Sequence, residues 1–381
     1  MNNMKKVIRT STIPMSLYIF ARKQLVELKD EYDVIVVSSP GEALEKLHKE
    51  CGVRTIVVPM ERHISLFRDL KSLIRMIRVF RKERPDMVHS ITPKAGLVSM
   101  LAAWVTRVPV RMHTFTGLVF PTSTGLKRRI LILMDKLICA CATYVNPEGL
   151  GVANDLKRFG VTKKPLHIIA NGNVRGIDMG HYDRTPEVMA LAEGIRKEGV
   201  TTFCFIGRIV RDKGINELVA SFDRLHREYP DTRLILIGGY EEKLDPLAPE
   251  TMERIKQGEG IEYVGRQNDV RPWLAASDIF VFPSYREGFP NTVIEAGAMG
   301  LASIVTDING SREIIVQGKN GEIVPSQDAD ALYSKMKEWV EHPDKVKVMA
   351  ASARQMAGDR YEQQIIQQAT IAVYRELLGE K

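Results

Sequence analysis

Glu287 and Glu295 flank the start of an expected helix in the last third of this 381-residue chain. An apolar run at residues 279–282 precedes them and is typical of a buried parallel strand. After a turn rich in proline and glycine, a helix is expected to begin at Asn291 or Thr292, where a short polar side chain can cap it. Unpaired amides and the helix dipole make such a helix start a site for an anion. Two carboxylates beside an anion site indicate a ligand with hydroxyls as well as phosphate, and a sugar nucleotide has both.

Arg208 and Lys213 lie in one loop that follows an earlier apolar run, residues 202–206. Gly207 and Gly214 flank them and would let the backbone approach a ligand. An arginine fork and a lysine point charge are natural partners of a diphosphate. Basic residues in a loop are usually only solvated, so the pattern gains meaning from the two glutamates in the same half of the chain. The sequence has no full G-x-G-x-x-G pattern, which disfavours a nicotinamide dehydrogenase, and no Walker A motif, which excludes a P-loop kinase.

Two histidines in the first half of the chain lie at the ends of expected strands. His89 precedes a polar loop that contains Thr92 and Lys94, and His113 precedes a loop that contains Gly117. Ligands of open α/β sheets bind beyond the carboxyl ends of the strands, so we expect His89, Thr92 and Lys94 to face a cleft. Either histidine could instead be a structural residue. The glycine-containing loop favours a site role for His113.

Strand and helix signals alternate along both halves of the chain, as in doubly wound parallel sheets. They include an expected strand at residues 165–169, and a polar stretch at residues 178–200 then interrupts the alternation. We therefore expect two Rossmann-like domains, residues 1–180 and residues 181–360. The last helix, residues 361–381, is expected to pack back on the first domain.

The composition is that of a soluble globular protein, with 44% hydrophobic and 27% charged residues. The net charge of +7 is compatible with an acidic partner, whether nucleic acid, anionic lipid or a phosphorylated substrate. The four cysteines lie in apolar or helical contexts without metal-ligand spacing. We therefore expect buried, reduced thiols and a cytoplasmic protein. No secretory signal is visible.

A helix expected at residues 66–84 has an apolar side and a strongly basic side. Leu70 and Ile77 are among the apolar residues at helical spacing, and arginines and lysines fill much of the remainder. The basic side is either an ordinary solvated face or a surface that rests on anionic lipid headgroups. The basic cluster at residues 127–129 adds weight to the second interpretation. The apolar segment after it, residues 130–145, contains charged residues and is too short to span a membrane, so a buried helix is expected.

The two motifs of the second half together resemble those of a known family. Phe205-Ile-Gly-Arg-x4-Lys-Gly214 and Glu287-Gly-Phe-Pro-Asn-x3-Glu295 are similar to the motifs of the retaining glycosyltransferases of family 4. These enzymes have the GT-B fold, with two Rossmann-like, doubly wound parallel-sheet domains and an interdomain cleft. The resemblance covers essentially the whole chain. The motif His89-x-x-Thr-Pro-Lys-Ala-Gly96 resembles that of one branch of this family. The enzymes of this branch build bacterial capsule, O-antigen and N-glycan precursors on polyprenyl-diphosphate lipids. Residues 9–14 depart from it, because many relatives have a Gly-Gly turn there.

The resemblance implies a role for each matching residue. Glu295 would bind the ribose hydroxyls, and Glu287, with amides of the loop after it, would hold the sugar and the diphosphate. Arg208 and Lys213 would neutralise charge on the departing UDP, and His113 would lie near the sugar. The expected catalytic residues are His113, Arg208, Lys213 and Glu287. The expected donor-binding residues are Gly207, Arg266, Gly288, Phe289, Pro290, Asn291, Thr292 and Glu295. The expected acceptor-side residues are Thr12, His89, Thr92, Lys94 and Thr116.

The implied reaction is a retaining transfer of a hexose or an N-acetylhexosamine from a UDP-sugar to a sugar acceptor on polyprenyl diphosphate. UDP leaves with negative charge while the sugar becomes oxocarbenium-like, so cations at the phosphates stabilise the transition state more than the ground state. Retention is usually explained in this family by same-face attack, with the leaving phosphate taking the acceptor's proton.

No cofactor and no divalent metal are expected. Asp328-Ala-Asp330 is formally a D-x-D motif, but it precedes an apolar helix, and helix capping explains it better. The expected partners are the nucleotide-sugar donor, a lipid-linked or other sugar acceptor and an anionic membrane surface, without nucleic acid. The expected location is the cytoplasmic face of the inner membrane.

Two other functions stay open at this point. A UDP-sugar 2-epimerase shares the GT-B architecture but isomerises or hydrolyses its substrate. A non-catalytic, basic binding protein for nucleic acid is the third candidate, and the absence of interleaved aromatics and of any recognised module argues against it.

Overall fold

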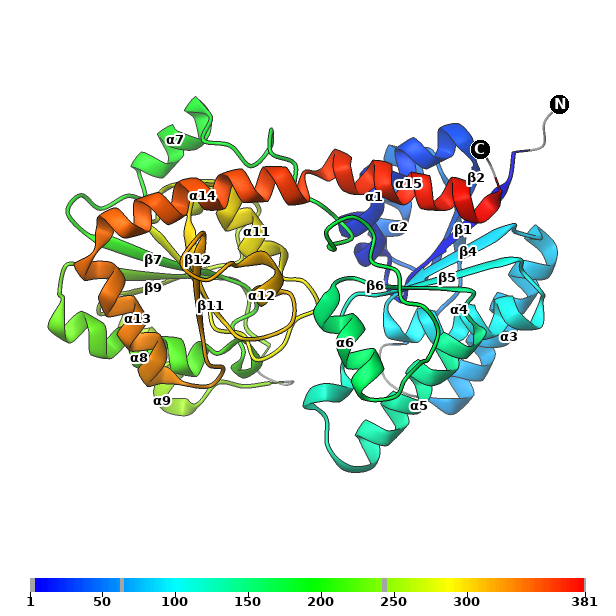
Figure 1. Ribbon diagram of the computed structural model, residues 1–381, viewed down its shortest axis with the longest axis horizontal. Helices are drawn as coiled ribbons and strands as arrows, with labels where there is room; N and C mark the ends of the chain where they lie inside the picture. The colour runs from blue at the N-terminus through cyan, green and yellow to red at the C-terminus, as the bar shows by residue number, and fades with distance from the viewer. Residues whose placement is uncertain (1–3, 62–64, 242–244, 380–381) are drawn as a thin grey trace. The chain divides into compact units, whose positions relative to one another are not determined.

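The computed structural model describes residues 4–61, 65–241 and 245–379. The chain forms two compact units: unit 1 is Met1–Gly176 with Gln364–Lys381, and unit 2 is Ile177–Gln363. The chain first passes from unit 1 to unit 2 after Gly176, close to the expected boundary at residue 180. The end of the chain belongs to unit 1, where Figure 1 shows the red helix α15 beside the blue helix α1.

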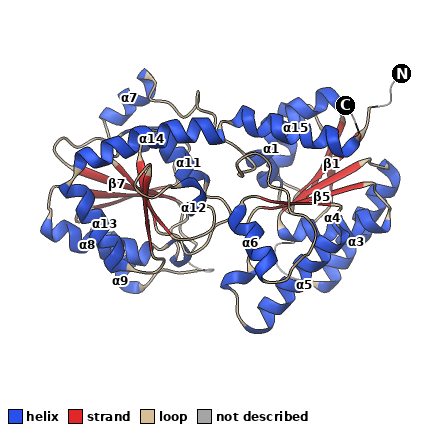
Figure 2. Ribbon diagram, in the orientation of Figure 1, coloured by secondary structure: helices blue, strands red, loops and turns tan. Residues whose placement is uncertain are grey.

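Unit 1 is built on a six-stranded parallel sheet in the order β3-β2-β1-β4-β5-β6. The order reverses between β1 and β4, which is the switch point where open α/β sheets bind ligands. Helices cover the sheet (Figure 2), so the central strands are buried along nearly their whole length. The strands are β1 (Lys6–Thr10), β2 (Asp33–Ser38), β3 (Arg54–Val57), β4 (Met87–Ile91), β5 (Val110–Phe115) and β6 (Tyr144–Pro147).

The helices of unit 1 include one from the far end of the chain. Arg375 of α15 pairs with Glu31 of α1 at 2.6 Å, and the ring of Tyr374 meets that of Tyr32 edge-on. The helices are α1 (Pro14–Glu31), α2 (Glu42–Cys51), α3 (Leu66–Glu83), α4 (Pro93–Val105), η1 (Phe120–Thr122), α5 (Gly125–Cys141), α6 (Leu150–Arg158) and α15 (Gln363–Leu378).

Unit 2 repeats the plan with a six-stranded parallel sheet in the order β12-β11-β10-β7-β8-β9. Here the order reverses between β7 and β10. The strands are β7 (Thr201–Ile206), β8 (Thr232–Ile237), β9 (Ile261–Gly265), β10 (Ile279–Phe282), β11 (Ala302–Thr306) and β12 (Gly321–Val324). The helices are α7 (Pro186–Glu193), η2 (Arg211–Lys213), α8 (Ile215–Glu228), α9 (Pro249–Gln257), α10 (Arg271–Ala275), α11 (Asn291–Ala298), α12 (Ser311–Ile314), α13 (Ala329–Glu341) and α14 (Pro343–Tyr361).

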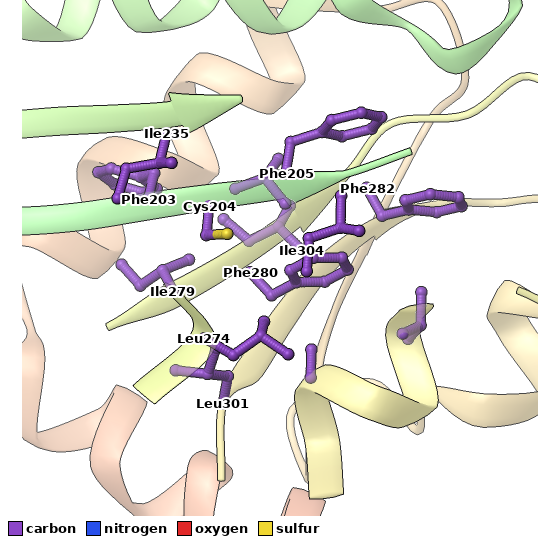
Figure 3. Packing of buried hydrophobic residues seen from close by; sticks show 14 of the residues in the cluster. Phe203, Cys204, Phe205, Ile235, Leu274, Ile279, Phe280, Phe282, Leu301 and Ile304 are labelled. Carbon is purple, nitrogen blue, oxygen red and sulfur yellow. The ribbon is translucent and has the colours of Figure 1, made fainter. Parts of the chain in front are cut away.

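Phenylalanines fix the two central strands of unit 2 against each other. Phe205 of β7 and Phe282 of β10 stack with ring centroids 5.8 Å apart and planes 9° apart, and Phe280 stacks on Phe282 at 6.2 Å (Figure 3). Such buried aromatic pairs contribute about 0.5–1.5 kcal/mol beyond their area burial. The ends of β7 and β10 are therefore held rigidly, and both lead into the loops that carry the motifs.

Two local expectations are wrong, and a third is confirmed only in part. Residues 165–169 form no strand, although the amide of His167 donates to the carbonyl oxygen of Val145 at 3.0 Å. The polar stretch before β7 contains a helix, α7, which is capped by the hydroxyl of Thr185. Helix α5 is buried on one side only, because Ile138 and Cys139 are buried whereas Leu133 is 58% exposed.

The four cysteines are free and buried, as expected. Among the helices that the structure describes, none is both long enough and apolar enough to cross a membrane.

Candidate functional site

The loops that follow β7 and β10 touch each other at the carboxyl edge of the unit 2 sheet. Gly214 has a left-handed φ of 70°, and a Cβ there would overlap the carbonyl oxygen of Pro283. A backbone hydrogen bond of 2.8 Å from Tyr285 to Asp212 joins the loops a second time. The glycine is therefore required for the close approach that brings the two sequence motifs together.

Lys213 and Glu287 form an ion pair where these loops meet. Ser284 donates its hydroxyl hydrogen to the same carboxylate oxygen at 2.9 Å, and Thr306 donates to the carbonyl oxygen of Ser284. The Lys213 and Glu287 side chains are 13% and 17% exposed, so both are largely shielded yet still reach solvent. The edge thus presents a fixed ammonium beside a fixed carboxylate.

Arg208 lies on the same edge and pairs with Glu241 at 2.6 Å. Partial burial works against its charge, but the hydrogen bond and charge of Glu241, with the charges of Asp212 and Glu287, raise the pKa of Arg208 above its ordinary value. Because β7 and β10 are neighbouring strands, Arg208 and the Lys213–Glu287 pair lie in adjacent loops.

Helix α11 begins at Asn291, as expected, but its N-cap residue is Pro290, which has no side-chain acceptor. The expected capping by Asn291 or Thr292 is therefore wrong. An N-terminus without a side-chain cap still directs the positive end of its dipole at an anion. Glu295 lies one turn further on and is 6% exposed. The loop before the helix is held by the ring of Phe289, which meets that of Tyr361 edge-on at 5.5 Å.

The remaining expected donor residues lie along this edge. Gly288 and Pro290 are buried, Gly207 is half-buried, and Arg266 is exposed directly after β9. The amide of Gly238 donates to the carbonyl oxygen of Gly265 at 2.9 Å, so the loops after β8 and β9 are neighbours. The strand order β10-β7-β8-β9 therefore places the loops with Glu287, Arg208 and Arg266 in this order along the edge, with the loop after β8 between the last two.

Both histidines are buried within unit 1. His113 is 1% exposed, its Nδ1 lies 2.8 Å from the hydroxyl of Ser90, and its ring packs against Gly96 and Phe115. Burial lowers the pKa of His113 to about 3, so the ring is neutral at neutral pH. The structure thus gives His113 a packing role in unit 1, and its role beside the sugar stays a prediction.

His89 is likewise enclosed, on the other face of the sheet. Its Nδ1 lies 2.5 Å from the hydroxyl of Tyr374 and its Nε2 2.7 Å from that of Thr114. Burial, followed by the charge of Arg9, lowers the pKa of His89 well below its ordinary value. His89 therefore links α15 to the sheet, and its acceptor-side role stays a prediction.

The other acceptor-side candidates are three threonines and Lys94. Thr12 and Thr92 meet through their hydroxyl oxygens at 2.8 Å at the start of α4, where Thr92 has an unusual φ of 71°. Thr116 is half-buried beyond β5. Lys94 is 5% exposed and paired with Asp69 of α3, so its charge is already neutralised inside unit 1.

The sequence did not indicate the residues that pair with the arginines of this site or that orient Glu287. Glu241 pairs with Arg208, Asp212 pairs with Arg286 at 2.9 Å, and Ser284 orients Glu287. Glu241 had a weak signal, because it follows a glycine pair at the end of an expected strand.

Asp328 caps α13 by accepting from the amide of Ala331 at 2.9 Å, which confirms the capping interpretation of the D-x-D motif. Within the part of the chain that the structure describes, no three His, Cys, Asp or Glu side chains gather as metal ligands could.

Two family models match the chain. The one described as Glycosyl transferases group 1 matches residues 200–342, and the one described as Glycosyl transferase 4-like domain matches residues 20–172. The chain is 30% identical over 383 residues to the capsular polysaccharide biosynthesis glycosyltransferase CapM of Staphylococcus aureus, which covers 99% of this chain and 98% of that protein. It is 27% identical over 314 residues to the UDP-Gal:alpha-D-GlcNAc-diphosphoundecaprenol alpha-1,3-galactosyltransferase of Escherichia coli, with 79% of this chain and 78% of that protein covered.

Solved structures share the architecture. Anabaena Alr3699/HepE, crystallised in complex with UDP and glucose, superposes with a TM-score of 0.82 over 98% of this chain and 100% of that chain. The sequence identity is 17%, so this likeness concerns the fold.

Proposed function

We propose that this protein is a retaining hexosyltransferase with a UDP-sugar as donor. The chain belongs to the glycosyltransferases of group 1 and has the GT-B fold. The proposed acceptor is a sugar carried on polyprenyl diphosphate, and the proposed role is in bacterial surface polysaccharide synthesis. The names of the capsular and the diphosphoundecaprenol-dependent relatives support both points. Family membership favours transfer over the epimerase and nucleic-acid-binding alternatives.

The observation that carries the proposal is the meeting of Lys213, Glu287 and Arg208 beside the uncapped start of α11. In the proposed complex the diphosphate lies against the first turn of α11, with Arg208 and Lys213 on its oxygens. Glu287 accepts hydroxyl hydrogens of the sugar, and Glu295 those of the ribose. A carboxylate alone would repel the donor, so cations within the same site are needed.

The proposed chemistry breaks the bond between the sugar's anomeric carbon and the β-phosphate oxygen, whose electron pair stays on UDP. The acceptor hydroxyl attacks the same face of the sugar, and its proton goes to the leaving phosphate oxygen. Arg208 and Lys213 act on charge that develops in the transition state.

We further propose that unit 1 rests on an anionic membrane through helices α3 and α5, which both pack against α4 (Figure 1). Each exposes apolar residues at helical spacing beside basic ones. We call this surface the basic–apolar face. Its apolar residues are Phe67, Leu70, Ile74, Leu126, Ile130, Leu133 and Leu137. Its exposed basic residues are Arg68, Lys71, Arg78, Arg81, Lys82, Lys127, Arg129 and Lys136.

A lipid surface suits this face because apolar side chains can enter the headgroup boundary while the basic ones meet anionic headgroups. Arg128 is excluded from the set because its guanidinium lies 4.9 Å over the ring of Phe159. The proposed location is therefore the cytoplasmic face of the inner membrane, where a polyprenyl-diphosphate acceptor would be presented.

The test of the proposed function is UDP release. A set of UDP-sugars is incubated with the protein, with and without a polyprenyl-diphosphate sugar, and the lipid product is identified by its mass and anomeric configuration. Release of UDP that depends on the acceptor and yields a retained linkage supports the proposal. Free sugar or an epimer formed from UDP-N-acetylglucosamine without acceptor would instead support the epimerase.

A further inference from the structure

We infer that Glu241 competes with the donor's diphosphate for Arg208, so that it limits the affinity of the site for UDP. The inference rests on the proposed function, because it concerns the anion that Arg208 would bind. It assigns Glu241 as a positioning residue that acts through Arg208 and does not contact the reacting atoms.

The backbone holds Glu241 beside Arg208. The amide of Ile209 donates to the carbonyl oxygen of Gly239 at 2.9 Å, and Ile209 and Tyr240 form a parallel bridge. A Cβ at Gly238 would overlap the carbonyl oxygen of Gly207, so the loops after β7 and β8 run in direct contact. The register of the two loops therefore brings Arg208 and Glu241 next to each other.

Carboxylates pair with three further cations of this edge. Arg211 pairs with Asp245 at 3.2 Å, Arg286 pairs with Asp212 at 2.9 Å, and Lys213 pairs with Glu287. An incoming diphosphate must therefore exchange carboxylate partners for phosphate oxygens. Glu241 differs from Glu287 because it has no proposed contact with the sugar, so its carboxylate only opposes the exchange.

The sign of the effect follows from the two states of Arg208. Without UDP, Arg208 and Glu241 stabilise each other, and binding must break this pair. With UDP bound, the Glu241 carboxylate lies near a second anion and repels it. Both terms weaken UDP binding, and removing the charge of Glu241 removes both. The opposite sign is expected if Glu241 accepts a hydroxyl hydrogen from the nucleotide, because its loss would then weaken binding.

The solvent exposure of Arg208 and Glu241 limits how much Glu241 can weaken UDP binding. The Arg208 and Glu241 side chains are 47% and 34% exposed, and exposed ion pairs contribute modestly to stability. We expect Glu241→Gln to tighten UDP binding by about two- to fivefold at low ionic strength. The gain should shrink as salt screens the charges.

The experiment measures the Kd of UDP and of uridine by calorimetry for the wild type, Glu241→Gln, Arg208→Ala and the double variant. Glu253→Gln is the matched control, because it removes the same charge from an exposed position on α9. A donor KM and a UDP inhibition constant are measured in parallel. Both should fall in Glu241→Gln, whereas kcat should not rise, because tighter binding of ground state and product does not lower the chemical barrier.

The inference is supported if Glu241→Gln tightens UDP binding, leaves uridine binding unchanged and has a smaller effect in the Arg208→Ala background, where only the repulsion between Glu241 and the diphosphate is left. Unchanged or weaker UDP binding in Glu241→Gln overturns it, as does an equal gain in Glu253→Gln. In those cases the proposed function still stands, provided that the wild type binds UDP. Absence of UDP binding by both the wild type and Glu241→Gln overturns the inference and the UDP-sugar donor together.

Discussion

The ammonium of Lys213 and the carboxylate of Glu287 pair across two loops that the close packing of Gly214 on Pro283 holds together. The residues of the pair come from separate βα connections, on β7 and on β10, at the switch point of the unit 2 sheet. Ser284 bonds the same carboxylate oxygen, so Glu287 has a fixed position before any ligand arrives. Preorganised charge of this kind is what stabilises a transition state at low cost in reorganisation.

We expect Glu287→Gln to lower kcat by about 10²–10³-fold, the range found when one preorganised group is removed. The amide keeps the shape of the side chain and can still accept from Ser284, so the melting temperature should change little. Lys213→Ala should cause a similar loss, and the double variant should lose less than the product of the two, because the residues act as a unit. Turnover within tenfold of the wild type in Glu287→Gln would remove Glu287 from the proposed mechanism.

Glu295 gives a test of nucleotide recognition. We expect Glu295→Ala to weaken UDP binding by about 10–100-fold, since hydrogen bonds to a charged group are among the stronger ones. The specific readout is two ratios of Kd values, that of the 2′-deoxy analogue to UDP and that of the 3′-deoxy analogue to UDP. The wild type should discriminate against at least one analogue, and Glu295→Ala should not. Unchanged UDP affinity in the variant would refute the ribose assignment, and Glu250→Ala on exposed α9 serves as the control.

The order of strand, loop and helix around Glu287 was largely predictable from sequence, whereas the side-chain contacts inside unit 1 were not, for a physical reason. Strand, loop and helix start follow one another directly around Glu287, so local pattern alone gives their order. The enclosure of His113 and the pairing of Lys94 with Asp69 depend on contacts across strands and helices, which spacing does not reveal. The exposure of Leu133 was missed for the same reason, because an apolar helix segment reads as buried until its neighbours are known.

The enclosure of His113 predicts a pH dependence of stability. Its pKa is about 3 in the folded protein against an ordinary value of 6.5, so below pH 6.5 the unfolded chain binds a proton that the folded protein does not. The free energy of unfolding should therefore fall as pH falls through this window, by about 1.4 kcal/mol per pH unit from this residue. Chemical denaturation of the wild type and His113→Asn at pH 7 and pH 5 measures it. We expect the wild type to lose about 2 kcal/mol more than the variant, and equal losses would contradict the assignment.

Metal independence is a separate prediction. The cations proposed to meet the diphosphate are Arg208 and Lys213, and Asp328 of the D-x-D motif is used as a helix cap. We expect full turnover in the presence of a strong chelator, measured as acceptor-dependent UDP release. Loss of turnover in chelator, restored by magnesium or manganese, would show that a divalent metal is needed. The chelator control is a melting curve, which separates a catalytic effect from unfolding.

The basic–apolar face predicts binding to anionic vesicles. We expect the wild type to float with vesicles that contain anionic lipid and to release as salt rises, because basic residues near the surface contribute about 1 kcal/mol each. Leu126→Ser/Leu133→Ser should reduce flotation at all salt concentrations, whereas Lys127→Ala/Arg129→Ala should reduce it mainly at low salt. Leu191→Ser is the matched control, because Leu191 is 62% exposed on α7 of unit 2, close to the 58% of Leu133. If Leu191→Ser impaired flotation as much as the α5 variants do, general surface apolarity, and not this face, would bind the membrane.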